Sequence, residues 1–204
     1  FLDGSARIAL QVEPPFTKYI FIEKSAGRAN TLRLLGRDFP TKCDSIVVVN
    51  EDANAYLQRI CTEKNWTRHR AVLFLDPFGM QVSWETIEAV ASTKAMDVWI
   101  LFPLGIAVNR LLRKDGDIPA PWRSRLDLLF GTSDWYDEFY TEDQLLFGEE
   151  SRVRKVADFP SISEFYVSRL KAVFAQVADR PRPLTNSTGN PLFHLCFAAG
   201  NPKG

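Results

Sequence analysis

The stretch AVLFLDPFG, Ala71 to Gly79, joins five apolar residues directly to an aspartate, a proline, an aromatic ring and a glycine. Three further runs resemble its apolar half, and they cover residues 19–22, 45–49 and 96–102. The four runs are rich in β-branched and aromatic residues and do not alternate polar with apolar positions. This pattern is typical of strands covered on both faces. The sequence therefore predicts a mostly parallel sheet.

Helix-like segments lie between these predicted strands. They cover residues 26–35, 54–64 and 84–93. We expect Gly36 to close the first helix, as glycine commonly does, and Ser83 to cap the start of the third. Alternating strands and helices are typical of the α/β class, and crossovers of this length make neighbouring strands parallel. The expected fold is Rossmann-like, with helices on both faces of a mostly parallel central sheet.

The pattern changes after the fourth predicted strand. Residues 104–158 hold several aromatic side chains among mixed charges, and we interpret them as a mostly helical insertion or lid. An amphipathic helix is expected over residues 162–178, ended by Pro181 and Pro183. A last apolar strand is expected over residues 191–199.

The composition limits the class of protein. The chain has 204 residues, 46% of them hydrophobic, which is enough for a single well-packed domain. Lys plus Arg equals Asp plus Glu at 25 each, so the chain as a whole does not attract nucleic acid or an anionic membrane. Three cysteines without a C-x-x-C motif favour a reducing, cytoplasmic location. We see no apolar run of 18 residues and no secretory leader, and we expect no membrane association.

Acidic residues follow three of the predicted strands, at Glu23, Asp52 and Asp76. In an open α/β sheet, ligands bind beyond the carboxyl ends of the strands. The Glu23 carboxylate can accept two hydrogen bonds from a ribose diol, and Asp52 can accept one from an adenine amino group. Ala53 leaves room for a flat base. These residues predict an edge that binds a nucleoside.

The motif Asp76-Pro77-Phe78-Gly79 serves poorly as a tight helix start, which favours a functional role. Asp76 and the Pro77 carbonyl are hydrogen-bond acceptors. Phe78 can stack on a planar group, and Gly79 lets backbone approach closely. The sequence therefore predicts that this motif positions a substrate.

Simpler roles compete with these assignments. Glu23 can instead pair with Lys24 or Arg28, and Asp52 can act as the N-cap of the helix that follows it. The basic stretch at residues 109–125 can contact a polyanion, but a solvated helix face is the favoured interpretation. The Trp and Tyr residues at 122–140 can stack a base, but burying the insertion against the sheet is favoured.

The two histidines do not suggest catalysis. His69 is expected at the surface, and His194 is expected to be a hydrogen-bonded histidine within the last strand. The sequence contains no His/Cys cluster that predicts a metal site, no readable Ser-His-Asp set and no phosphate-binding G-x-x-x-x-G-K motif. We therefore expect no metal.

The acidic strand ends, the D-P-F-G motif and a final strand of antiparallel type resemble those of class I S-adenosylmethionine-dependent methyltransferases. D-P-F-G is similar to the D-P-P-Y motif of amine methyltransferases, with phenylalanine and glycine replacing the second proline and the tyrosine. A closer resemblance, over about residues 4–202, is to the three-Cys-motif partner (TcmP) family. It rests on the segments YIFIEK, DPFGMQVSWETIEAVASTKAMDVWILFPLGIAVNRLL, KVADF and NSTGNPLFHLCFAAGNP.

The resemblance implies S-adenosylmethionine as the cofactor, an unknown methyl acceptor and a partner that is a radical-SAM-like protein with a three-cysteine motif. It implies a cofactor site made by Asp3, Gly4, Glu23, Lys24, Asp52 and Ala53, and a catalytic set made by Asp76, Pro77, Phe78 and Gly79. In the family a glycine-rich loop would lie between residues equivalent to Asp3 and Gly4. The acceptor can be an amine on nucleic acid or protein. The alternative is a non-catalytic, methyltransferase-like partner protein.

Overall fold

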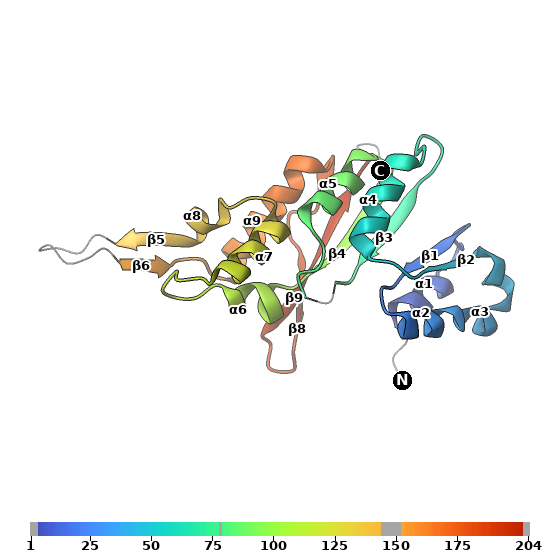
Figure 1. The fold of residues 1–204 in the computed structure, drawn as a ribbon, viewed down its shortest axis with the longest axis horizontal. Coiled ribbons are helices and arrows are strands. Elements are labelled where there is room, and N and C mark those ends of the chain that lie inside the picture. Colours follow the sequence, from blue (N-terminus) through green and yellow to red (C-terminus); the bar gives the residue numbers. More distant parts are fainter. Residues whose placement is uncertain (1–3, 78, 144–151, 202–204) are drawn as a thin grey trace, which may run out of the picture. The chain divides into compact units, whose positions relative to one another are not determined.

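The computed structural model describes residues 4–77, 79–143 and 152–201 (Figure 1). The chain divides into two compact units, Phe1–Arg59 and Ile60–Gly204, and each is described by itself. The expectation of one domain, with 104–158 as an insertion, stays a prediction.

The first unit contains one parallel pair of strands and short helices. β1 pairs with β2 in register, so that Tyr19 lies opposite Ile46 and Ile22 opposite Val49. Leu10 and Ala29 are fully buried in this unit. Its elements are α1 (Ser5–Gln11), β1 (Tyr19–Ile22), α2 (Ala26–Arg33), α3 (Leu35–Asp38), a 3₁₀ helix (Pro40–Ser45), β2 (Ile46–Val49) and α4 (Ala53–Glu63), which continues into the second unit.

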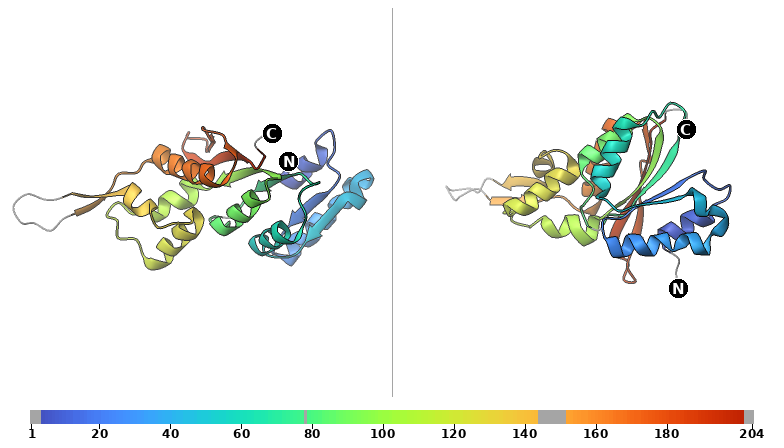
Figure 2. Two further views of the ribbon diagram at one scale, coloured as in Figure 1. Left: turned by 90° about the horizontal axis from the view of Figure 1, so that it is seen from above. Right: turned by 45° about the vertical axis from the view of Figure 1, so that its right-hand side comes forward.

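The second unit contains a five-stranded sheet, a helical region and a separate hairpin. Figure 2 shows the hairpin β5–β6 projecting beyond α7 and α8. The elements are β3 (Ala71–Leu75), α5 (Trp84–Ser92), β4 (Met96–Phe102), a π-helix (Leu104–Val108), α6 (Asn109–Leu111), α7 (Ala120–Phe130), α8 (Trp135–Phe139), β5 (Tyr140–Asp143), β6 (Arg152–Lys155), α9 (Phe159–Val173), β7 (Gln176–Val177), β8 (Arg182–Thr185) and β9 (Pro191–Ala199).

The five predicted strands lie close to their expected positions, but the prediction of a mostly parallel Rossmann-like sheet is wrong. Strands β5 to β8 were not predicted: β5 and β6 lie in the segment interpreted as mostly helical, and β7 lies where the helix over 162–178 was expected. The five-stranded sheet has the order β3-β4-β9-β7, with β8 also paired to β9. β3 and β4 are parallel, whereas β9 runs antiparallel to β4, β7 and β8. β1 and β2 form a separate two-stranded sheet, and no strand in the described part of the chain pairs with both β1 and β3.

The connections explain this difference. A helical crossover joins β1 to β2 and β3 to β4, and such crossovers give parallel pairs. A short turn instead joins β8 to β9, and such a turn reverses the direction of the chain. β7 and β8 run in the same direction and pair with successive parts of β9. The long β9 therefore adds three antiparallel pairings to the sheet.

The expectation that both faces of these strands are covered is also wrong for the five-stranded sheet. On one face of the five-stranded sheet, Val72 and Trp99 are 53% and 39% exposed. Val98 and Ile100 point to the opposite face and are buried. An apolar run without alternation therefore does not require that both faces of a strand be covered.

The core of the second unit includes an aromatic cluster contributed by β4, α9 and the segment between them. The rings of Phe102 on β4 and Tyr166 on α9 stack with their centroids 4.2 Å apart. Phe130, Trp135 and Phe139 of the insertion are buried and pack edge to face or tilted against one another. Phe130 contacts Phe102 of β4, and both Phe130 and Phe139 contact Phe165 of α9. The buried Trp135 packs on Phe130 and Phe139, so that packing of the tryptophans and tyrosines directly against the sheet stays a prediction.

Two helix ends differ from prediction. Gly36 lies inside α3 and does not close a helix, because α2 and α3 follow each other almost without interruption. α9 ends at Val173, well before Pro181, because the buried Phe174 adopts an extended conformation there. Ser83 does occupy the N-cap position of α5, but its side chain makes no capping hydrogen bond to the helix backbone. None of the helices in the described ranges is both long and apolar enough to cross a membrane.

Candidate functional site

The carboxyl ends of β1 and β2 lie side by side because the strands are parallel and in register. The Glu23 amide donates to the Val49 carbonyl at 3.0 Å, which extends the pairing one residue past β1. The Asn50 side-chain amide then donates to the carbonyls of Glu23 and Lys24, at 2.8 and 2.9 Å. Asn50 therefore ties the segment after β2 to the segment after β1.

Glu23 is held by three hydrogen bonds. Its Oε1 accepts from the Ser25 backbone N–H at 2.7 Å and from Arg28 Nη2 at 3.0 Å, while Oε2 accepts from Arg28 Nε at 2.9 Å. The bonds from Arg28, and next the bond from the Ser25 amide, lower the pKa of Glu23 below its ordinary value. Glu23 is therefore an ionised, acceptor-only group at neutral pH.

Asp52 has two roles in the structure. Its Oδ1 accepts from the backbone N–H groups of Asn54 and Ala55 at 3.0 and 3.4 Å, which caps the start of α4. Its Oδ2 accepts from Lys24 Nζ at 3.2 Å, and this bond is the main cause of a lowered Asp52 pKa. The N-cap interpretation is confirmed, and contact with an adenine amino group stays a prediction.

The structure brings four of the predicted cofactor residues together in the first unit: Glu23, Lys24, Asp52 and Ala53. Gly4 precedes α1 as its N-cap residue, and its carbonyl accepts from the Arg7 and Ile8 amides at 2.9 and 3.1 Å. Asp3 lies outside the described residues.

The predicted catalytic motif belongs to the second unit and directly follows β3. Asp76 is exposed and Pro77 is half-buried. Gly79 has a φ of 71°, in the left-handed region, and apart from its chain neighbours nothing lies within 4 Å of a Cβ added there. Phe78 lies outside the described residues, so its stacking role stays a prediction.

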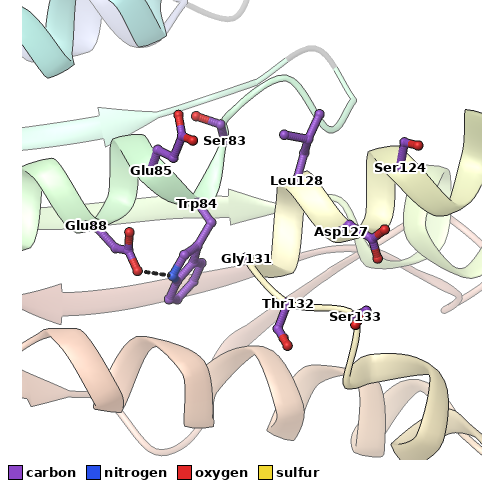
Figure 3. A pocket seen from close by; sticks show the side chains of 10 residues that line it. All are labelled: Ser83, Trp84, Glu85, Glu88, Ser124, Asp127, Leu128, Gly131, Thr132 and Ser133. Atoms are coloured by element: carbon purple, nitrogen blue, oxygen red, sulfur yellow. Dashed lines mark hydrogen bonds between the residues drawn. The ribbon is translucent and has the colours of Figure 1, made fainter.

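The second unit also holds an open cavity of about 540 Å³ near α5 and α7 (Figure 3). Its lining is acidic and hydroxylic, and Trp84 Nε1 donates to Glu88 Oε1 at 2.9 Å within it. The lining residues are Ser83, Trp84, Glu85, Glu88, Ser124, Asp127, Leu128, Gly131, Thr132 and Ser133. None of the predicted site residues belongs to this cavity. In the described ranges, no three His, Cys, Asp or Glu side chains are grouped as a metal site requires.

His194 is a hydrogen-bonded residue of β9, as predicted. Its Nδ1 lies 2.7 Å from the hydroxyl of Ser163 on α9, and Ser163 is buried. Partial burial lowers the pKa of His194, so the neutral imidazole is favoured.

Sequence reasoning missed the role of Asn50 and left the partner of Glu23 open. An amide residue directly after an apolar strand was the available signal for Asn50. Of the two cations proposed for Glu23, the structure selects Arg28, while Lys24 pairs with Asp52.

No protein-family model matches this chain, and comparisons with curated proteins and with solved structures found no significant match.

Proposed function

We propose that this chain binds S-adenosylmethionine at the carboxyl ends of β1 and β2 and acts as a methyltransferase. The observation that carries the proposal is the pairing of these strands, which brings Glu23 and Asp52 to one edge of the first unit. Two ionised acceptors beside a small residue, Ala53, suit a nucleoside, which presents a diol and an exocyclic amino group. A cytoplasmic location, favoured by three free cysteines, belongs to the same proposal.

The described residues supply hydrogen-bond acceptors for the nucleoside half of the cofactor. Glu23 would hold the ribose hydroxyls, and Asp52 keeps acceptor capacity on Oδ2 besides its bond to Lys24. Bound S-adenosylmethionine would supply an activated methyl group. The methionine half would fall to Asp3 and Gly4, as the resemblance implies.

The catalytic part of the proposal concerns the motif after β3. Asp76 and the carbonyl of Pro77 are acceptors that can hold the N–H groups of an amine and direct its lone pair. Holding an acceptor in line with a transferable group contributes a large part of the rate enhancement in such reactions. The proposed acceptor is an amine on protein or nucleic acid, and a radical-SAM-like protein with a three-cysteine motif is the proposed partner.

Calorimetric titration with S-adenosylhomocysteine tests the cofactor site. We expect micromolar binding by the wild type and a loss of about tenfold or more in Glu23→Gln, because hydrogen bonds to a charged group contribute roughly 1.5–3 kcal/mol. Glu51→Gln is the matched control, since Glu51 is in the same segment as Asp52 but pairs with Arg59 at 2.6 and 2.8 Å. Equal affinity in all three proteins would contradict the proposed site.

Methyl transfer tests the enzyme. RNA, DNA and basic peptides are offered with radiolabelled S-adenosylmethionine, and Asp76→Asn is compared with the wild type. We expect Asp76→Asn to bind S-adenosylhomocysteine normally but to lose turnover by about a hundredfold. If the wild type binds the cofactor and transfers a methyl group to no acceptor, the non-catalytic partner function is favoured instead.

A further inference from the structure

The carboxylate of Glu23 has too few free acceptor positions for a ribose diol. An ionised carboxylate offers about four lone-pair sites. Three of them are used by well-formed hydrogen bonds, one from the Ser25 backbone N–H and two from Arg28, while the Lys24 backbone N–H has the smallest effect on the carboxylate. One site therefore remains, whereas two hydroxyl groups that both donate to Glu23 need two.

Of the three hydrogen bonds to Glu23, those from Arg28 can break most easily when a ligand binds. The Ser25 bond joins groups two residues apart and is fixed by the backbone at the start of α2. The Arg28 side chain is 73% exposed and comes from the first turns of α2, so its guanidinium can turn into solvent. From this count we infer that Arg28 competes with the ribose diol for Glu23, and that it must release at least one hydrogen bond when the ligand binds. The inference rests on the proposed nucleoside site.

The competition predicts a difference between ribose and 2′-deoxyribose ligands. A 2′-deoxyribose donates one hydroxyl to Glu23 and uses the one free site, so it binds without displacing Arg28. A ribose gains a second hydrogen bond but must break one with Arg28. Arg28 therefore reduces the advantage of ribose over deoxyribose, and its removal should restore that advantage.

The test uses adenosine and 2′-deoxyadenosine, which carry no charge and therefore do not respond to the lost arginine by simple attraction or repulsion. Affinities are measured by calorimetry or NMR titration for the wild type, Arg28→Ala and Arg33→Ala. Arg33 is the matched control because it lies on α2 and donates to Asn30 at 2.6 Å, not to Glu23. An exposed ion pair contributes about 0.2–1 kcal/mol, so we expect Arg28→Ala to bind adenosine roughly 1.4- to 5-fold more tightly.

The affinity of Arg28→Ala for 2′-deoxyadenosine should equal that of the wild type. Arg33→Ala should bind both ligands with the affinity of the wild type.

A second measurement is the carboxyl pKa of Glu23, followed by carbon-13 NMR in the absence of ligand. It should be higher in Arg28→Ala than in the wild type, because the group that lowers it has been removed.

The outcomes separate this inference from the proposed function. If adenosine binding depends on Glu23 but is unchanged or weaker in Arg28→Ala, the competition is refuted and the site stands. An equal gain for both ligands would also refute it, since the count of acceptor sites would then be irrelevant. If no variant binds adenosine, both the site and the competition are refuted.

Discussion

A methyl group added at Gly131 should destabilise the second unit strongly. Gly131 ends α7 with a φ of 70°, and a Cβ there would overlap the Cβ, Cγ and Cδ1 atoms of Trp84. Trp84 is only 3% exposed, its indole N–H is bonded to Glu88, and the guanidinium of Arg169 lies 4.9 Å from its ring centre. The ring therefore has little freedom to move away.

Two costs add in Gly131→Ala. The left-handed conformation costs a non-glycine residue about 1–2 kcal/mol. Overpacking a well-packed site costs about 1–3 kcal/mol more. The sum is about 2–5 kcal/mol, which lowers the Tm of a chain of this length by roughly 4–20 °C, at about 2–4 °C per kcal/mol.

Thermal unfolding followed by circular dichroism measures the effect, with Gly189→Ala as the control. Gly189 also has a positive φ, 81°, but nothing lies within 4 Å of an added Cβ. Gly189→Ala should lower the free energy of unfolding only by the cost of the left-handed conformation, about 1–2 kcal/mol. If Gly131→Ala lowers the Tm no more than Gly189→Ala does, the result contradicts the close packing of Trp84 against the end of α7.

Two further predictions concern buried polar and thiol groups. Ser163→Ala leaves Nδ1 of His194 without its partner and should cost about 1–3 kcal/mol in denaturant unfolding. Ser168→Ala, an exposed serine on the same helix, should change stability by less than about 0.5 kcal/mol. Iodoacetamide should label the exposed Cys43 in the folded protein. Cys196 should react only after unfolding, because burial raises the pKa of its thiol to about 12, and similar labelling of both in a peptide map would contradict the fold.

The positions of the secondary-structure elements could be predicted because they depend on local patterns. Strands β3, β4 and β9 begin and end where the apolar runs do. The pairing of the strands could not be predicted in the same way. It depends on which backbone edges meet, and β9 meets β4 from a position far along the chain. The alternation of strands and helices correctly predicted the parallel pairs β1–β2 and β3–β4, but it did not show which strands share one sheet.

The candidate site shows the same division. The sequence by itself identified Glu23 and Asp52 as acidic strand ends and named Arg28 and Lys24 as cations within reach. Only the tertiary structure decided that Arg28 pairs with Glu23 and Lys24 with Asp52. The physical reason is that composition and spacing determine which charges are available, whereas a hydrogen bond also requires direction and a short distance. Those depend on the parallel register of β1 and β2 and on the start of α2.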